Sequence, residues 1–410
     1  MHATLRLLSF AFILLAASLC AQAQSAQKCA HELESMGAPM FENNSVQILP
    51  TGVGKYEELF ADIRKAKRYV HMDYFKFQQD SICMELFGLL AAKARQGVEV
   101  RIIFDALGNK DCQQPLTKKF LRQLRADGIQ IEAFDPVRLP WVNHLLHRDH
   151  HKIAVIDGLM AYSGGMNVAD YYLFGKPRVG MWRDMHMKLR GPVVDGYEHL
   201  FEVMWFDVSG QLLPPAQYRA QHAQEGHVPI ALVDRQPHGT PAIMRDAYAS
   251  AINNAQSDIQ IINPYATLTR TVRRALYSAL RRGVRVQIMA SLRSDVSVTP
   301  DVVAQQMRRL MKRGAEVYYF TGGFHHSKVM TIDNEFCCVG TTNMDGRSLR
   351  NDYEVSLFVF DSHTTHQLQE IFYRDIKEHC FMLTPTLWHQ RFSTSQRFCG
   401  RFFTPIRSNL

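Results

Sequence analysis

One five-point pattern occurs twice in this chain, and the repetition constrains the possible folds more than any other feature. In both copies a His is followed by Lys, Asp, Gly and Asn at the same spacing. The copies are His150, Lys152, Asp157, Gly164, Asn167 and His326, Lys328, Asp333, Gly340, Asn343. A lone His-x-Lys is usual in a solvated loop, but a second copy with identical spacing is far rarer by chance. We therefore expect each copy to supply one group to a shared reaction.

The similarity of the two halves extends upstream of the pattern. Each half has a strand pattern, a helical stretch that ends at a glycine, and a second strand pattern. These are 69–77, Gly97 and 98–106 in the first half, and 259–265, Gly283 and 284–292 in the second. Helices that stop at glycine before β-branched strands indicate αβ units around a largely parallel sheet.

The sequence therefore predicts an α/β fold of two homologous domains, over residues 45–210 and 228–390. A pseudo-two-fold axis between them would bring both patterns to one cleft. A polar stretch at 211–239 is the predicted linker. The first half is longer just before His150, by residues that include Pro136, Leu139, Pro140, Trp141, Leu145 and Leu146. This insertion forms either a lip over the cleft or a loop packed on its own domain.

The N-terminal residues resemble a secretion signal. Arg6 precedes an uncharged apolar run at 7–19, and Ala-Gln-Ala at 21–23 suits a signal peptidase. The run is shorter than the about 20 apolar residues of a membrane span. We therefore predict a signal peptide at 1–23, with an uncleaved anchor as the alternative, and an exported chain that is periplasmic or peripheral on a bacterial membrane.

Charge and cysteine content narrow the partners. The net charge of +8 favours anionic partners, which include phospholipid head groups, a membrane surface and nucleic acid. Signal cleavage would leave seven scattered cysteines, an odd set that is not a disulfide framework; Cys380 and Cys399 are one candidate pair. No Cys/His spacing resembles a zinc site.

The residues around both patterns resemble the phospholipase D superfamily, whose hallmark is the doubled His-x-Lys-x4-Asp motif. The resemblance covers about residues 46–390 and narrows to the bacterial cardiolipin synthase branch. It is carried by HRDHHKIAVIDGLMAYSGGMNVADYY (147–172), MWRDMHMKLRGPVV (181–194), HHSKVMTIDNEFCCVGTTNMDGRSL (325–349) and 46–75. Two departures are an apparent signal peptide where the branch often has two membrane helices, and Asp352-Tyr353-Glu354 where it tends to have Asn-Phe-Glu. The resemblance implies two phospholipase D-like domains, each a mixed sheet flanked by helices, with one shared active site.

The resemblance also implies a mechanism. One histidine attacks phosphorus to form a phosphatidyl-histidine, and the other protonates the departing alcohol and deprotonates the incoming one. By analogy His150 is the nucleophile and His326 the acid/base. Asp157 and Asp333 would hydrogen-bond the imidazoles, each across to the other half.

The remaining pattern residues would bind the substrate phosphate. Lys152 and Lys328 share a face with their histidines at i and i+2 and neutralise its oxygens. Asn167 and Asn343 can donate amide hydrogen bonds to the same oxygens. No metal or cofactor is expected, because the lysines supply the positive charge.

Several neighbours have two readings. The flanking His147, His151 and His325 are supporting or solvated. Glu354 and Ser348 shape an acceptor pocket or simply pack. Trp182 is predicted in the core, with Arg183 and Asp184 as an ion pair. The basic-aromatic tail at 388–410 is either an interfacial helix or docked on the second domain.

The leading functional hypothesis is a phosphatidyltransferase that makes cardiolipin from two phosphatidylglycerols at a membrane surface. The alternative is a phospholipase D, in which water replaces the acceptor and phosphatidic acid results. An exported nuclease fits the charge, but the apolar insertion and the tail fit lipid better, so no nucleic acid and no protein partner are predicted. A non-enzymatic membrane-binding protein is disfavoured because all six His, Lys and Asp positions are intact.

Overall fold

The computed structural model describes residues 24–136 and 147–405 of the 410-residue chain. The predicted signal peptide at 1–23 lies outside these ranges, as do residues 137–146 of the insertion before His150 and the last five residues of the tail. Those predictions therefore stay predictions. Within the described ranges, no helix combines the length and the apolar character that crossing a membrane requires.

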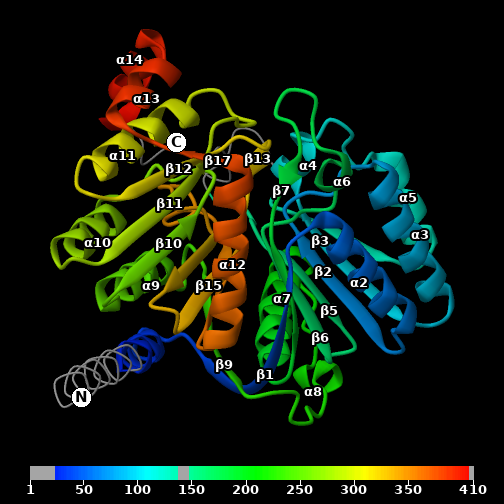
Figure 1. Cartoon of the computed structure of the whole chain (residues 1–410). Helices are drawn as coiled ribbons and strands as arrows, with labels where there is room; N and C mark the ends of the chain where they lie inside the picture. The colour runs from blue at the N-terminus through cyan, green and yellow to red at the C-terminus, as the bar shows by residue number, and fades with distance from the viewer. Residues whose placement is uncertain (1–23, 137–146, 406–410) are drawn as a thin grey trace.

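Two halves with the same strand order make up one sheet of fifteen strands among the described residues (Figure 1). From the centre outward, the first half contains β1 (Met40–Leu49), β8 (His186–Arg190), β6 (Met160–Gly164), β5 (Lys152–Ile156), β2 (Tyr69–Tyr74), β3 (Glu99–Asp105) and β4 (Gln130–Phe134). The second contains β9 (Val228–Arg235), β16 (Glu354–Val359), β15 (Phe336–Gly340), β14 (Val329–Ile332), β10 (Asp258–Ile262), β11 (Arg285–Ser291), β12 (Glu316–Phe320) and, beyond it, β17 (Cys380–Met382). β1 and β9 pair antiparallel at the centre, so the two orders are related by a pseudo-two-fold axis, as predicted.

The prediction of a largely parallel sheet is wrong. Within the fifteen-stranded sheet of the described residues, only β2, β3 and β4, and their counterparts β10, β11 and β12, pair in parallel, while the remaining neighbours pair antiparallel. The cause lies in the motif, because β5 and β6 form a hairpin, as do β14 and β15. In each hairpin two successive turn residues have positive φ, Asp157 with Gly158 and Asp333 with Asn334, which is the geometry of a tight turn between antiparallel strands. The sheet is therefore mixed.

Helices cover the sheet and fill the space between the halves. The outer helices are α2 (Gly52–Lys65), α3 (Ser81–Arg95), α5 (Lys118–Ala126), α9 (Ile243–Asn254), α10 (Arg270–Arg281) and α11 (Thr299–Met311). α7 (Val193–Ser209) and α12 (Ser362–His379) lie in the centre of Figure 1. They share one buried core with strands of both halves, including Ile153, Trp205, Val355 and Phe372, so the halves are fused by apolar burial.

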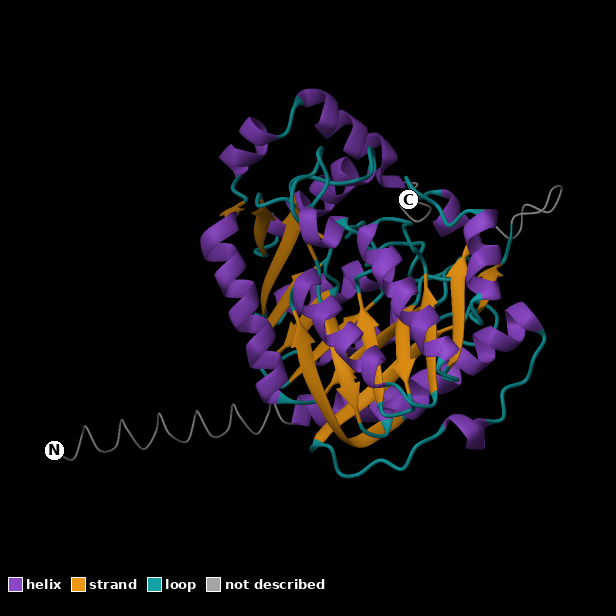
Figure 2. Cartoon of the chain, turned by 90° about the vertical axis from the view of Figure 1, so that its right-hand side faces the viewer, coloured by secondary structure: helices purple, strands orange, loops and turns teal. Residues whose placement is uncertain are grey.

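Short elements complete the chain. They are a helix at 24–35, α4 (Ala106–Lys110), α6 (Tyr171–Phe174), α8 (Pro215–Tyr218), α13 (Pro385–Arg391), α14 (Thr394–Phe403), and the strands β7 (Trp182–Arg183) and β13 (Phe324–His325), which pair across the halves. The connection that carries α8 runs along the outside of the molecule (Figure 2). The predicted linker at 211–239 thus includes this connection and β9, which belongs to the sheet.

Two predictions about the C-terminal part can be scored. The cysteines of the described residues, Cys380 and Cys399 included, are free thiols, so the candidate disulfide is wrong. The tail at 388–405 is divided between both readings, because Trp388 and Phe392 are buried in the second-half core while Phe398 and Phe402 of α14 are exposed.

Candidate active site

The two motif histidines are fixed by backbone contacts with the opposite half. His150 stands two residues before Lys152, the first residue of β5, and its N–H donates to the carbonyl of Tyr353 at 3.0 Å. His326 stands three residues before β14, and its N–H donates to the carbonyl of Arg183 at 2.6 Å. Each histidine is therefore placed by the residue just before an acidic side chain of the other half.

Those acidic side chains hold the imidazoles. Nδ1 of His150 lies 2.9 Å from Oε1 of Glu354, and Nδ1 of His326 lies 2.7 Å from Oδ2 of Asp184. Both carboxyl groups are fully buried. A carboxylate at Nδ1 requires that nitrogen to carry the proton, which leaves Nε2 with a lone pair. In His326 that Nε2 lies 3.1 Å from Nζ of Lys328.

The prediction that Asp157 and Asp333 hold the imidazoles is wrong, although the predicted crossing between the halves is right. Asp157 instead accepts hydrogen bonds from the N–H groups of Lys67, Arg68 and Tyr69, at 2.8–2.9 Å. Asp333 accepts equivalent bonds from 256, 257 and 258. Both sit in hairpin turns at the far end of the motif strand, because an aspartate tolerates the positive φ required there. They brace the start of β2 and of β10.

The motif glycines explain how the acids reach the histidines. A Cβ on Gly164 would meet the Met185 carbonyl and the His186 Cα at 2.6 Å, and one on Gly340 would meet the Val355 carbonyl at 2.4 Å. Each glycine therefore lets the strand that carries the acid approach closely. His186 pairs with Gly164 and Ser356 pairs with Gly340, so the acids two residues earlier, Asp184 and Glu354, occupy equivalent positions.

The motif lysines are buried beside the histidines. Nζ of Lys152 donates to the carbonyl of His150 at 2.6 Å, and Nζ of Lys328 donates to that of His326 at the same distance. Burial lowers the pKa of Lys152 to about 7 and that of Lys328 to about 8, against the opposing charges of Glu354 and Asp184. An anionic group bound between the two amines would therefore favour their protonated, charged form.

Burial and the two lysines also keep the imidazoles neutral. Burial, then the charge of Lys152, lowers the pKa of His150 well below its usual value. Burial and Lys328 lower the pKa of His326 to about 4. The partner acids differ, since burial raises the pKa of Glu354, whereas the hydrogen bond from His326 and the positive charge of Lys328 act against burial, and the pKa of Asp184 is lowered. The two histidines therefore have unequal environments despite the pseudo-symmetry.

One cavity of about 440 Å³ brings the predicted residues together. His150, His326, Asn167 and Asn343 line it, with Lys152 and Lys328 behind the histidines. The Oδ1 atom of Asn167 accepts from the N–H of Lys76 at 3.1 Å, which fixes the orientation of the amide. The other lining residues are Phe75, Lys76, Leu107, Asp111, Tyr171, Lys176, Trp182, Tyr265, Asp295, Val296, Thr299, Asp345, Arg347, Ser348 and Asp352.

Sequence reasoning considered the two acids but gave them other roles. Arg183 does not pair with Asp184 as predicted; its Nε donates to Asp375 of α12 at 2.8 Å. Glu354 was weighed only as a pocket or packing residue. The available signal was the register, because each acid stands two residues before the strand position opposite a motif glycine. Trp182 is buried as predicted, yet it also lines the cavity.

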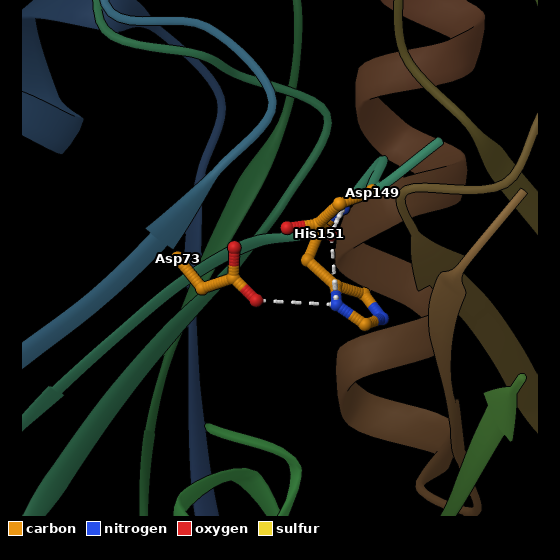
Figure 3. Close-up of side chains that lie close together, drawn as sticks. All are labelled: Asp73, Asp149 and His151. Carbon is orange, nitrogen blue, oxygen red and sulfur yellow. Dashed lines mark hydrogen bonds and ion pairs between the residues drawn. The ribbon is translucent and has the colours of Figure 1, made fainter. Parts of the chain in front are cut away.

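The flanking histidines support the site from behind. His147 bonds the Asn351 carbonyl and His325 bonds Asp375. His151 lies between Asp73 and Asp149, with Nδ1 at 3.3 and 3.1 Å from their carboxyl oxygens (Figure 3). Three such side chains can surround a metal ion. Burial disfavours the charged form of His151, but the charge of Asp149 raises the pKa of the imidazole well above its usual value. The protonated ring of His151 therefore provides the positive charge between the two carboxylates.

Comparisons with known proteins agree with this geometry. The family model described as "Cardiolipin synthase, PLD-like domain" matches residues 59–205 and 248–376. The chain is 32% identical over 358 residues to a cardiolipin synthase of Listeria monocytogenes, covering 87% of this chain and 73% of that protein. It is 33% identical to the major cardiolipin synthase of Bacillus subtilis, covering 82% and 69%. The crystal structure of the phosphatidylserine synthase of Haemophilus influenzae superposes with a TM-score of 0.72 at 13% identity, over 94% of this chain and 98% of that one, which shows a shared fold.

Proposed function

This chain belongs to the cardiolipin synthase family of phospholipase D-like proteins and is a phospholipid phosphatidyltransferase, and we propose that it joins two phosphatidylglycerols into cardiolipin and glycerol. The observation that carries the proposal is the reciprocal pair of acid-held histidines at one cavity. Two separately positioned imidazoles are what a two-step transfer requires.

In the first step, Nε2 of His150 attacks the phosphorus of the donor lipid. The phosphorus–oxygen bond to the glycerol head group breaks, and His326 gives its Nε2 proton to the departing oxygen. Entry of the anionic phosphate favours the protonated form of His326 by charge. Lys152 and Lys328 neutralise the nonbridging oxygens, and the amides of Asn167 and Asn343 donate to them.

In the second step, a hydroxyl of the acceptor lipid attacks the phosphatidyl-histidine. His326 takes the hydroxyl proton, the phosphorus–nitrogen bond breaks, and His150 returns as the neutral imidazole. The assignment of His326 as acid/base is supported by Asp184, because an ionised carboxylate stabilises the imidazolium that each proton transfer creates. Transfer to water at this step would give phosphatidic acid.

Lipid analysis tests the reaction. The purified chain is incubated with phosphatidylglycerol vesicles without divalent metal, and the products are identified by mass spectrometry. Cardiolipin and glycerol are expected from the wild type and from a control, His366→Ala, whose side chain is 59% exposed on α12, but not from His150→Ala. Phosphatidic acid without cardiolipin would make the chain a hydrolase. Untouched lipid would reopen the nuclease and binding-protein hypotheses.

Trapping of the intermediate tests the roles of the two histidines. With a phosphatidyl-p-nitrophenol donor, whose leaving group needs no proton, and an alkaline quench, which spares a phosphorus–nitrogen bond, His326→Ala is expected to retain lipid bound covalently to His150, because it lacks the base of the second step. His150→Ala is expected to retain none. The reverse pattern would exchange the two roles.

We further propose that the cavity mouth faces an anionic lipid surface. Phe174 and Met181 of the first half and Val296 of the second are exposed by 71%, 55% and 40%, on segments that also contribute Tyr171, Lys176 and Asp295 to the cavity. On α14, which packs on α11, Phe398 and Phe402 stack at 6.2 Å and are exposed by 69% and 64%. Exposed aromatic side chains near Arg397 and Arg401 suit an anionic membrane interface.

A paired substitution tests this surface. Phe398→Ser with Phe402→Ser is expected to weaken binding to phosphatidylglycerol vesicles at least tenfold, since each buried aromatic side chain contributes about 1.5–3 kcal/mol. The control is Leu212→Ser, which removes a side chain that is 76% exposed in the connection between the halves. Equal binding by both variants would contradict the proposal. Export by the N-terminal segment remains part of the proposal, and it would place the reaction outside the cytoplasm.

A further inference from the structure

The cavity has a basic end that the two-step transfer does not use. Lys76 and Lys176 both line it, together with the carboxyl groups of Asp111 and Asp295. Neither lysine belongs to a His-x-Lys pair, and neither contacts a motif histidine in the hydrogen bonds of the described residues. The transfer consumes one phosphate at the histidines, so a second basic position needs another explanation.

Lys176 is a half-buried cation held by aromatic faces. Its Nζ lies 4.3 Å from the ring centre of Tyr171 and 4.6 Å from that of Trp182. The Trp182 ring in turn lies 5.4 Å from the His326 ring, so a single indole separates the ammonium group from the proposed acid/base. Among the described residues no carboxylate lies within ion-pair distance of Lys176, and burial lowers its pKa although Asp295 opposes this. A cation in this state gains from an anionic ligand.

Lys76 offers a second donor at the same end. Its N–H orients Asn167, and its Nζ bonds Asp111 at 2.6 Å. The Asp111 side chain is 76% exposed, so solvent screens that pair. The hydroxyl of Tyr265 donates a hydrogen bond to Asp295 and so partly satisfies that carboxylate. The two carboxylates therefore balance the charges of the lysines without enclosing either ammonium group.

The basic end is not reproduced by the pseudo-symmetry. Tyr69 and Asp258 are equivalent, because the aspartates of the two motif turns bond them in the same way, and this register places Tyr265 opposite Lys76. From Asn167 to Asp184 the first half is six residues longer than the second half from Asn343 to Glu354, and the longer segment carries Lys176. The first half thus has the ammonium groups of Lys76 and Lys176, where the second half has the phenol of Tyr265 and a shorter loop.

We propose that Lys76 and Lys176 bind the phosphate of the acceptor, one glycerol unit away from the hydroxyl that attacks the phosphatidyl-histidine. This inference rests on the proposed phosphatidyl transfer and identifies the acceptor class as a glycerol that carries a phosphate. A phosphodiester of a second lipid and a free glycerol phosphate share this chemistry. The lysines hold the acceptor so that its hydroxyl proton faces His326, which receives it when the phosphorus–oxygen bond forms.

Competition between acceptors tests the inference. Phosphatidylglycerol vesicles are supplied with ethanol, so that one donor serves an anionic acceptor, giving cardiolipin, and a neutral one, giving phosphatidylethanol. Lys176→Gln is expected to lower the ratio of cardiolipin to phosphatidylethanol about tenfold or more, as loss of a charge-assisted bond to a phosphate predicts. Lys76→Gln is expected to lower it in the same direction. The control is Arg178→Gln, which removes an equal charge from an exposed position of the same loop and should leave the ratio unchanged.

The outcomes separate this inference from the proposed function. Equal losses of both products, or an unchanged ratio, in the lysine variants would overturn the acceptor site, because the lysines would then serve the donor or the fold. A wild type that forms phosphatidylethanol but no cardiolipin would overturn the proposed function and the acceptor site together. A parallel reaction with glycerol 3-phosphate as acceptor distinguishes the two sources: a loss confined to cardiolipin means that the site takes the lipid form only.

Discussion

Asp184 and Glu354 occupy equivalent positions in the two halves, and each hydrogen-bonds the motif histidine of the other half. Each histidine–carboxylate pair is therefore made of one residue from each half. Every histidine has its own lysine from the same motif but depends on the opposite half for the carboxylate that fixes its tautomer. This exchange underlies the first prediction.

Glu354→Gln and Asp184→Asn are expected to reduce kcat about a thousandfold each with little change in KM, because an amide can bond Nδ1 but neither enforces the tautomer nor stabilises an imidazolium. Steady-state kinetics on short-chain phosphatidylglycerol measures both constants. Thr341→Val, which removes only the hydroxyl that bonds Glu354 at 2.5 Å, is expected to lose far less. A full loss in Thr341→Val with little effect of Glu354→Gln would contradict this reading.

Asp157→Ala is expected to destabilise the fold by about 3 kcal/mol while leaving the activity of the folded fraction largely intact. The substitution leaves three N–H groups at the start of β2 without their charged acceptor. Urea unfolding and activity normalised to folded protein are measured together. Asp207→Ala, at an exposed position, is the control. A stable but inactive Asp157→Ala would restore the catalytic role first expected for this residue.

The dependence of kcat/KM on pH is expected to be bell-shaped. Lysines bind phosphate only when protonated, and the pKa values of Lys152 and Lys328 are about 7 and about 8. Activity should therefore be lost as the pH rises through 7 to 8. On the acid side it should fall only well below the usual histidine pKa, where protonation of His150 removes the lone pair that attacks phosphorus. An alkaline limb that begins only near pH 10 would show that the lysines are not the limiting groups.

Gly164→Ala is expected to impair catalysis through Asp184. An added Cβ would meet Met185 and His186 at 2.6 Å, at a backbone φ of 152° that L residues rarely adopt. The strand carrying Asp184 must then move away from His326. The expected result is a loss of kcat larger than that of an equally destabilising substitution in the core away from the cavity, such as Leu90→Ala on the buried side of α3. Equal losses in the two variants would mean that Gly164 acts only through stability.

The sequence predicted the repeat, the two domains and the convergence of the histidines, lysines and asparagines, because these follow from local spacing that is the same in both halves. It failed where the outcome depended on tertiary register. Asp157 follows His150 by seven residues in the sequence, whereas Asp184 lies 142 positions from His326, and yet Asp184 is the carboxylate that strand pairing brings to an imidazole. Arg183 pairs with Asp375, which lies 192 positions away in the sequence, and no local pattern indicates that pairing. The αβ pattern predicts a largely parallel sheet because αβ units dominate the chain length and the hairpins that break the rule are short; the mixed sheet that the family resemblance implies is confirmed.

The antiparallel seam between β1 and β9 holds together two repeats that are each chemically incomplete. An isolated half would carry a histidine without its carboxylate and a carboxylate without its histidine. A substitution of the carboxylate in one repeat consequently changes the state of the histidine in the other. The two repeats therefore form one functional unit, and neither could be excised as an independent enzyme.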